Sequence, residues 1–347
     1  MRKCPLIMTL VLLLLLLGIG DAKENQPFVT LMTHDSFAVS KNLLHSFQKQ
    51  YGTEIKILKS GDAGAALNQA ILSRKNPLAD VFFGVDNTFM SRALRTGIFE
   101  AYVPLFLDDI PAHLKLDATN RLHPVDYGDV CLNYDKEWFS EKGLVPPQGL
   151  DDLIKPEYKG LTVVQNPATS SPGLAFLLTT VGKYGEKGYL NFWKKLRENN
   201  VYVTVGWSSA YYGKFTRAKG GTCPIVVSYA SSPSAEVYYS EKKLDAAPTA
   251  GVLSPGSAFR QIEFVGVLAG TKKPDLARKL IDFMLSPEFQ RDIPLHMWVF
   301  PANQTVPLPD IFLQYAGKAD TPVMLSPKAI EMGREKWIEA WTDTVLR

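Results

Sequence analysis

Apolar runs and amphipathic stretches alternate along the chain, and polar turns separate them. Residues 28–33, 54–58 and 79–84 are apolar runs of strand length. The stretches between them carry apolar residues at the spacing of a helix face, as Leu43 and Phe47 do. Strands that alternate with helices of this length indicate a parallel sheet with helices on its faces. The sequence therefore predicts an α/β fold class for the N-terminal part.

The same alternation returns after residues 102–126, which are rich in Pro and Asp and are interpreted as the edge of a first domain. Further strands are predicted at 129–134, 161–165, 201–205, 224–229 and 263–268, and further helices over 174–184, around Trp193, from Ser208, after Ser231, over 274–284 and from Pro327. Trp337 and Trp341 share one face of the last helix, which predicts core packing. A second α/β unit is therefore expected.

The first 22 residues have the composition of a secretory signal peptide. A basic start precedes an apolar run at residues 6–17, and Gly20 and Ala22 fit the small residues of a cleavage site before Lys23. The apolar run is short for a membrane span, and no later stretch reaches about 20 apolar residues. We expect an exported, soluble protein whose signal peptide, residues 1–22, is removed near Ala22.

Charge and cysteine content narrow the function classes. The chain has 38 Lys and Arg against 35 Asp and Glu, a net charge of +3, and no basic run. Nucleic acid is therefore not an expected partner. Cys131 and Cys223 remain after cleavage of the signal peptide. They could pair in an oxidising compartment or stay as buried free thiols, and the sequence leaves both alternatives open.

Catalytic and metal-binding motifs are missing from the predicted mature chain. It has no phosphate-binding or dinucleotide-binding glycine loop, no G-x-S-x-G, no H-E-x-x-H and no C-x-x-C. Its five histidines are scattered without the spacing of metal ligands. A binding protein is therefore expected in place of an enzyme, with no cofactor and no metal.

Polar residues follow three consecutive predicted strands in the N-terminal part. They are His34 and Asp35, then Asp62 and Ala63, then Asp86. In open α/β sheets, ligands bind outside the carboxyl ends of the strands. Each turn could also serve only to cap a helix. Three such turns at one sheet edge favour ligand contact by these residues.

A hydroxyl-rich turn, residues 166–173, connects the predicted strand at 161–165 to a long apolar helix. Thr169, Ser170 and Ser171 offer side-chain oxygens beside the unpaired backbone N–H groups of a helix start. This arrangement suits a small polar or anionic group of a ligand. One of the three residues could also act as the helix N-cap, alone or in addition.

Aromatic residues occur at the ends of strands in the second half. Trp207 and Tyr211 follow one predicted strand, Tyr229 ends the next just before Ser231, and Trp298 lies in a later turn. Core packing is the ordinary role of such residues. At a crevice they can instead hold a cation over a ring, for roughly 0.5–2 kcal/mol. Together with Asp62, they suit a ligand with a positively charged aromatic part and a polar or phosphorylated end.

Several stretches together resemble the thiamine-binding proteins of bacterial ABC importers, within the type II periplasmic binding-protein superfamily. They are His-Asp-Ser-Phe at 34–37, Gly-Val-Asp-Asn at 84–87, Asp-Tyr-Gly at 126–128, the turn at 166–173, Gly-Trp-Ser at 206–208, Ser-Tyr-Ala-Ser-Ser-Pro at 228–233 and Phe-Met-Leu-Ser-Pro-Glu-Phe at 283–289. The resemblance covers essentially the whole predicted mature chain.

The resemblance implies two lobes, each a mostly parallel sheet flanked by helices, with the ligand cleft between them. The expected lobes are residues 27–126 plus 262–296 and residues 127–261 plus 297–347. It further implies a periplasmic, monomeric receptor without a cofactor. Such a receptor closes by hinge motion on thiamine or a thiamine phosphate ester, and delivers it to the permease and ATPase of an ABC importer.

The resemblance also assigns roles to residues. Asp62 and Ala63 match the loop near the aminopyrimidine or thiazolium ring, and residues 169–171 match the turn that faces the phosphate end. The matched pocket aromatics are Trp207, Tyr229 and Trp298. Enterobacterial members carry Tyr in place of His34 and a Tyr near residues 234–236, where this chain has Ser-Ala-Glu. These departures leave the preferred phosphorylation state open.

Two alternatives accompany this interpretation. Related lobes hold ferric iron with adjacent tyrosines, and this chain has such pairs at 211–212 and 238–239. Both pairs lie in helix-like runs, where neighbouring side chains point about 100° apart. The other alternative is a thiamine- or pyrimidine-salvage enzyme on the same lobes. It would need a nucleophile in the cleft, whereas Cys131 and Cys223 fall within predicted strands.

Overall fold

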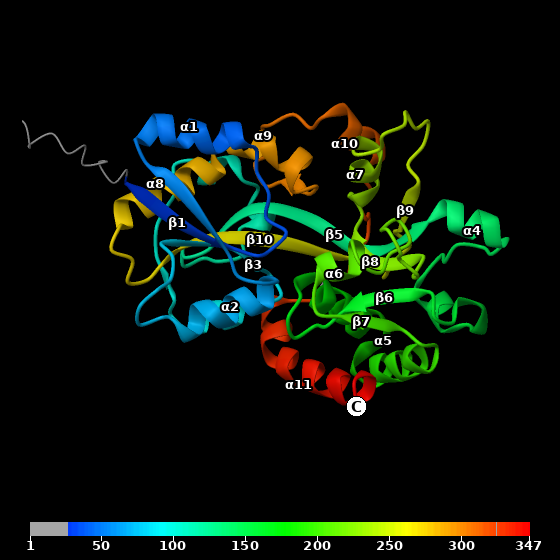
Figure 1. Ribbon diagram of the computed structural model, residues 1–347. Helices are drawn as coiled ribbons and strands as arrows, with labels where there is room; N and C mark the ends of the chain where they lie inside the picture. The colour runs from blue at the N-terminus through cyan, green and yellow to red at the C-terminus, as the bar shows by residue number, and fades with distance from the viewer. Residues whose placement is uncertain (1–26, 324) are drawn as a thin grey trace, which may run out of the picture.

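The computed structural model describes residues 27–323 and 325–347. The predicted signal peptide lies outside the described residues. The described chain forms α-helices and β-strands in alternation, with short 3-10 helices in the connections (Figure 1).

The N-terminal elements begin and end close to the predicted positions. They are β1 (Phe28–Thr33), α1 (Lys41–Tyr51), β2 (Glu54–Lys59), α2 (Ala63–Leu72), β3 (Val81–Asp86), α3 (Met90–Arg95), β4 (Phe99–Glu100), η1 (Leu107–Asp109) and η2 (Ala112–Leu114). Local chemistry sets these limits. The Ser40 hydroxyl accepts from the N–H of Leu43 at the start of α1, and Gly52 ends this helix with a φ of 62°.

The middle of the chain crosses between two groups of strands. Its elements are β5 (His123–Asp135), α4 (Lys136–Lys142), η3 (Leu150–Ile154), η4 (Pro156–Tyr158), β6 (Thr162–Gln165), α5 (Ser171–Glu198), β7 (Tyr202–Thr204), α6 (Trp207–Tyr211), β8 (Ile225–Tyr229), α7 (Ser232–Tyr238) and β9 (Thr249–Val252). The α5 range contains a kink at Gly185, whose φ is 69°. Two helical segments were expected here, and the kink separates them.

The C-terminal elements return across the sheet. They are β10 (Phe259–Leu268), α8 (Pro274–Leu285), α9 (Pro287–His296), β11 (Phe300–Pro301), α10 (Asp310–Tyr315) and α11 (Pro327–Val345). Trp341 of α11 packs edge-to-face on Trp193 of α5, with ring centroids 5.5 Å apart, and Trp337 is also buried. The predicted core packing of the two C-terminal tryptophans is confirmed.

The strands form one mixed sheet in the order β2-β1-β3-β10-β5-β8-β6-β7. β2, β1 and β3 are parallel to one another and form the first parallel group; β8, β6 and β7 form the second parallel group. β10 and β5 lie between the groups and run antiparallel to their neighbours. The predicted α/β class is confirmed, and the two expected sheets are joined into one by these crossing strands (Figure 1).

One predicted strand begins earlier than expected. The strand predicted at 129–134 is β5, which already begins at His123. This strand is buried along nearly its whole length, so it lacks the alternation of polar and apolar residues that marks a half-exposed strand. Its Pro124, Asp126 and Gly128 are residue types depleted in strands.

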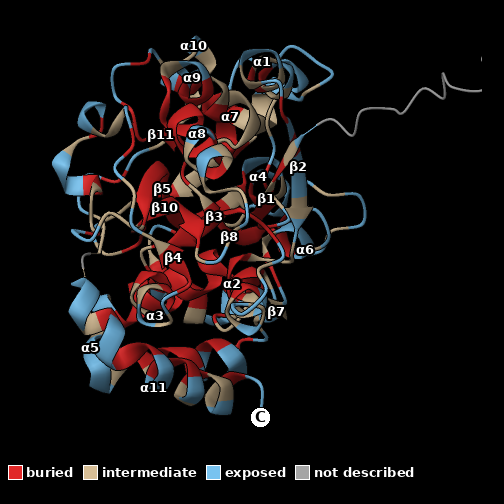
Figure 2. Cartoon of the chain, turned by 90° about the vertical axis from the view of Figure 1, so that its left-hand side faces the viewer, coloured by how far each residue is buried: buried red, intermediate tan, exposed pale blue. Residues whose placement is uncertain are grey.

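Helices cover both faces of the sheet and bury most of its side chains. Buried residues gather around the strands, whereas the outer faces of α5 and α11 are exposed (Figure 2). Cys131 and Cys223 are buried in different small clusters and are not paired with each other, which selects the free-thiol alternative.

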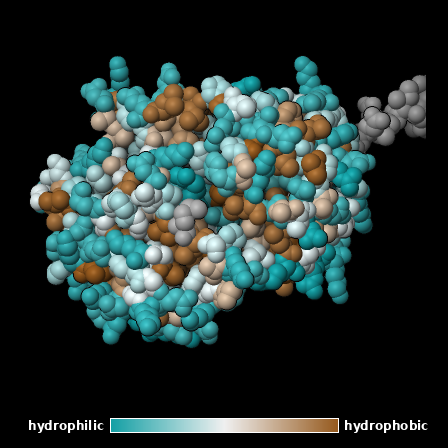
Figure 3. Space-filling view, turned by 180° about the vertical axis from the view of Figure 1, so that it is seen from behind, coloured by the Kyte–Doolittle hydropathy of each residue, from teal (hydrophilic) through white to brown (hydrophobic). Residues whose placement is uncertain are grey.

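Hydrophilic residues predominate on the face of the molecule seen in Figure 3, with apolar groups scattered among them. Over residues 27–323 and 325–347, we find no helix with the length and apolarity that crossing a membrane requires.

Candidate ligand-binding cleft

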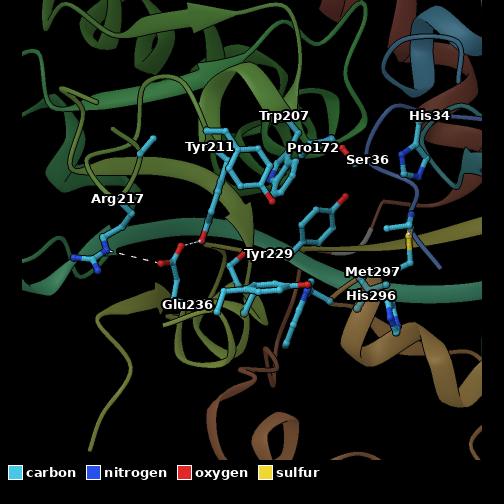
Figure 4. A pocket seen from close by; sticks show the side chains of 18 of the residues that line it. His34, Ser36, Pro172, Trp207, Tyr211, Arg217, Tyr229, Glu236, His296 and Met297 are labelled. Atoms are coloured by element: carbon cyan, nitrogen blue, oxygen red, sulfur yellow. Dashed lines mark hydrogen bonds and ion pairs between the residues drawn. The ribbon is translucent and has the colours of Figure 1, made fainter. Parts of the chain in front are cut away.

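A cavity of about 920 Å³ lies where the two parallel groups meet across β5 and β10 (Figure 4). Its size is that of a small-molecule site. Eight predicted site residues line it: His34, Asp62, Ala63, Ser171, Trp207, Tyr211, Tyr229 and Trp298. They come from turns that are distant in sequence, as expected for a site at the carboxyl ends of strands.

Trp207 and Tyr211 form a stacked pair on the second parallel group's side of the cavity. Their ring centroids are 5.0 Å apart and their planes differ by 20° (Figure 4). The indole N–H of Trp207 donates to the Ser228 hydroxyl at 2.9 Å, and the Tyr211 hydroxyl donates to Glu236 at 2.6 Å. These bonds fix both rings, so the cavity has a preformed aromatic wall.

Tyr229 lies at the end of β8 against the backbone of β5. A Cβ on Gly128 would come within 2.9 Å of the Tyr229 ring, so only glycine permits this approach. Gln261 donates to the Tyr229 hydroxyl at 3.0 Å. Burial, together with Glu263, raises the pKa of Tyr229 well above its ordinary value, so the phenol stays neutral.

Trp298 is held in an unusual backbone conformation. Its φ of 58° lies in the left-handed region, which costs a non-glycine residue about 1 kcal/mol or more. The Ser231 hydroxyl donates to the Trp298 carbonyl at 2.5 Å, and the indole packs against Tyr238 and Tyr239. Ser231 itself does not line the cavity. The hydrogen bond indicates that Ser231 holds the Trp298 backbone in position. Ligand contact by Ser231 stays a prediction.

Asp62 connects the first parallel group to the second. One carboxylate oxygen caps α2 by accepting from the Ala63 N–H at 2.7 Å, and the other accepts from the Trp207 N–H at 2.9 Å. A Cβ on Gly206 would lie 2.6 Å from the Asp62 carboxylate, so a larger residue here would displace this carboxylate from the Trp207 N–H. Burial raises the pKa of Asp62, and the two backbone bonds partly oppose the shift. Asp62 therefore caps α2 and lines the cavity at the same time, and ligand contact by Asp62 stays a prediction.

The hydroxyl-rich turn is largely occupied by contacts within the protein. Thr169 donates to the carbonyl of Val205 at 2.6 Å, Ser170 is fully buried, and Ser171 donates to Asp86. Of the three hydroxyl residues, only Ser171 lines the cavity. Whether any of them contacts a ligand stays a prediction.

Asp86 and Asp35 also lie off the cavity wall. Asp86 is fully buried and accepts from Ser171 and from the backbone and hydroxyl of Thr88. Burial raises its pKa to about 6. Asp35 is exposed and accepts from the Gly61 N–H at 3.0 Å, which orders the turn beside the cavity. Both predicted ligand contacts stay predictions.

Glu263 is the main cavity residue that sequence reasoning missed. It lies on β10 in the cavity wall, with a carboxylate oxygen 3.6 Å from Nε2 of His34. Burial alone would lower the pKa of His34, but Glu263 and Asp62 outweigh it and the pKa is raised. The signal in the sequence was a glutamate at the head of the apolar run 263–268.

The cavity wall carries an excess of acidic groups. The acidic residues that line it are Asp62, Glu236, Glu241 and Glu263, and the lining Lys and Arg residues are Arg217 and Lys242. Arg217 is itself paired with Glu137, Glu236 and Asp135, at 3.3, 3.8 and 3.9 Å. Apart from Asp62, these residues were not among the predicted site residues. The wall therefore attracts cations.

The pair Tyr211 and Tyr212 does not favour iron. Tyr211 donates to Glu236, and burial raises the pKa of both Tyr211 and Tyr212, which disfavours the phenolate that binds iron. Within the part of the chain that the structure describes, no three His, Cys, Asp or Glu side chains are grouped to hold a metal ion.

Known proteins resemble this chain over most of its length. The thiamine-binding periplasmic protein of Escherichia coli (strain K12) is 33% identical over 328 residues, which cover 93% of this chain and 94% of that protein. A solved periplasmic thiamin-binding protein has a TM-score of 0.82 at 30% identity, with 93% and 97% of the two chains covered. This likeness confirms the predicted fold of a periplasmic binding protein.

An iron-bound protein from Pseudomonas aeruginosa shares the fold with a TM-score of 0.74 at 18% identity, over 92% of this chain and 99% of that chain. The likeness at this identity shows the fold alone. The family model for bacterial extracellular solute-binding proteins matches residues 76–313. Proteins of this family are transport receptors and not enzymes, as predicted for this chain. With a family match over two thirds of its length, the chain belongs to the bacterial extracellular solute-binding proteins.

Proposed function

We propose that this protein is the thiamine receptor of an ABC importer. It would bind thiamine, or a thiamine phosphate ester, in the cavity between the two parallel groups and deliver it to the permease and its ATPase. The names of the similar proteins suggest the ligand. The observation that carries the proposal is the combination of an aromatic wall with an excess of acidic groups.

Thiamine's chemistry matches this combination. Its thiazolium ring is a permanent cation, and its aminopyrimidine is a flat heteroaromatic ring. A cation over Trp207, Tyr229 or Trp298 would gain roughly 0.5–2 kcal/mol, depending on how dry the site becomes. Asp62 and Glu263 would supply the opposite charge in a partly desolvated cavity, where attraction is stronger than in water.

The crossing strands suggest how the receptor closes. We place one lobe at residues 27–126 plus 262–296 and the other at residues 127–261 plus 297–347, so that β5 and β10 each pass between lobes. Asp62 already accepts from the Trp207 N–H at 2.9 Å, so the two sides of the cavity touch in this structure, and hinge bending at these strands would separate them to admit the ligand. We expect a periplasmic monomer from which residues 1–22 are removed near Ala22.

Calorimetric titration of the mature protein tests the proposal. Thiamine and its mono- and diphosphate should each be titrated, and bound ligand should be identified by mass spectrometry after denaturation of freshly purified protein. Saturable one-to-one binding is expected. Dissociation constants all weaker than about 1 mM, an affinity of only ~4 kcal/mol, would overturn it.

A further inference from the structure

Three carboxyl groups stand side by side across the crossing strands. Glu263 of β10 lies opposite Asp86 of β3 on one side and opposite Asp126 of β5 on the other. Side chains of directly opposite residues lie on the same face of a sheet. Asp86 and Asp126 are almost completely buried, and Glu263 is 6% exposed at the cavity wall. Like charges so placed repel each other strongly.

Among the described residues, no neighbouring group donates a hydrogen bond to the Asp126 carboxyl group. Both of its carboxyl oxygens are buried without a partner. Asp86, by contrast, accepts from Ser171 and twice from Thr88. An ionised Asp126 would therefore be an uncompensated buried charge next to a second carboxylate, which is strongly unfavourable.

Glu263 is better placed to hold the negative charge of the pair. One of its oxygens lies 3.6 Å from Nε2 of His34 and 3.4 Å from the amide nitrogen of Gln261. It also borders the cavity, where a cationic ligand would lie. Burial and the neighbouring Glu263 raise the pKa of Asp126 well above its ordinary value.

We propose that Asp126 is protonated in the folded protein and donates a hydrogen bond to Glu263, holding that carboxylate toward the cavity as the counter-charge for a cationic ligand. Asp126 does not line the cavity, so it is a positioning residue that acts through Glu263. The ligand part of this inference rests on the proposed function. The protonation part does not.

Infrared spectroscopy of the ligand-free mature protein at pH 7 tests the protonation. The wild type should show the C=O stretching band of a protonated carboxyl group, and D126N should lose most of it. Asp117 offers a matched control because it is also nearly buried but accepts from Thr119, Arg121 and Leu122. D117N should leave the band in place. A wild type without the band, or a band of undiminished intensity in D126N, overturns the inference; a weak remaining band is expected from Asp86, whose pKa is about 6.

Thiamine titration of the same variants tests the positioning. Asparagine keeps a neutral donor at residue 126, so D126N should lose at most about threefold in affinity, whereas D126A should lose at least tenfold. Equal losses in D126N and D126A would overturn the positioning role. Circular dichroism at the titration temperature confirms that each variant is folded. If the wild type does not bind thiamine or its esters, the proposed function fails while the infrared result still decides the protonation.

The pH dependence of unfolding gives a second readout, which does not need a ligand. A carboxyl whose pKa is raised on folding favours the folded state at low pH and loses this advantage as pH rises through its folded-state pKa. Asp126 lies opposite Glu263 of β10 on one side and Pro301 of β11 on the other. The further groups around the pair act through Glu263: His34 and Gln261 contact it, and Asp86 lies opposite it. D126N should show a smaller loss of stability with rising pH than the wild type does. An unchanged slope would contradict the inference.

Discussion

The two sides of the cavity differ in what they contribute. The first parallel group's side and β10 bring the buried or partly buried ionisable groups His34, Asp62 and Glu263. The second parallel group's side brings the stacked rings of Trp207 and Tyr211, and Arg217 there is paired with Glu236 (Figure 4). One side therefore provides ionisable groups beside the crossing strands, and the other provides the flat aromatic surface together with the Arg217–Glu236 ion pair. A ligand that needs both is held well only when both sides contact it, which couples recognition to closure.

The two sides of the cavity also differ in how hydrogen bonds hold their side chains in position. The aromatic wall is fixed by ordinary hydrogen bonds from Trp207 and Tyr211 to neighbours on its own side. The charged side keeps carboxyl groups in a buried place with few donors, at a cost in folding free energy. A cationic ligand would offset part of that cost. Substitutions on the two sides should therefore affect ligand binding and protein stability in different proportions.

The largest effect is expected on the charged side. Glu263→Gln removes the counter-charge with little change of shape, and the affinity for thiamine should fall about 30- to 100-fold, or roughly 2–3 kcal/mol. Above the raised pKa of His34, the stability of the ligand-free protein should stay equal or rise because a buried negative charge is lost; below that pKa, it should fall because protonated His34 loses its partner. Calorimetry and urea unfolding measure the two quantities. Glu241→Gln, on an exposed residue of the same wall, is the control and should cost less than threefold.

The next largest loss of thiamine affinity is expected for a substitution on the aromatic side. Trp207→Ala removes the stacked ring and should weaken thiamine binding about tenfold, roughly 1.4 kcal/mol. Trp207→Phe keeps a flat ring but loses the bond to Ser228, so it should recover part of the affinity. A Phe variant as weak as the Ala variant would show that the hydrogen bond, and not the ring, is what matters.

Acid should weaken binding through His34. Its raised pKa means that the attraction to Glu263 stabilises the folded protein fully below about pH 6.5 and fades as pH rises through the higher folded-state pKa. Protonated His34 also neutralises Glu263 and repels a cation. Thiamine affinity should therefore fall about three- to tenfold from pH 8 to pH 6, as titrations at both values would show.

His34→Gln separates the contribution of His34 to the pH dependence of thiamine affinity from the contributions of the other groups that titrate nearby. Asp86, with a pKa of about 6, and Asp126 remain in the variant, so any pH dependence that survives belongs to them. The variant should bind with an affinity that changes less than twofold over the same range. An unaltered pH profile would rule out His34 as its origin.

The smallest effect is expected behind the aromatic side. Ser231→Ala removes the hydrogen bond to the strained Trp298 backbone, and it should cost about 1 kcal/mol of stability and about threefold in affinity. Thermal unfolding and calorimetry measure these losses. Ser231→Thr keeps the hydroxyl and serves as the matched variant. A stability loss without any loss of affinity would separate Trp298 from ligand binding.

Residue patterns were sufficient for the local structure. The apolar runs and the polar turns after them located the N-terminal strands to within a few residues, because periodicity acts over a single strand or helical turn. They failed at the start of β5, where a strand buried on both faces has no alternation to recognise. Matching motifs along the chain then identified the family, which a single turn could not have done.

Only the tertiary structure decided which polar groups share a site. The sequence determined that hydroxyl and carboxyl residues follow the strands, but the register of β10 against β3 and β5 places Glu263 between Asp86 and Asp126. Inter-strand contacts likewise direct Ser171 to Asp86 and Ser231 to the Trp298 carbonyl. A pattern of neighbours along a chain carries no information about register between distant strands. Whether a carboxyl is capped, paired or left to hold a proton therefore depends on the packed fold.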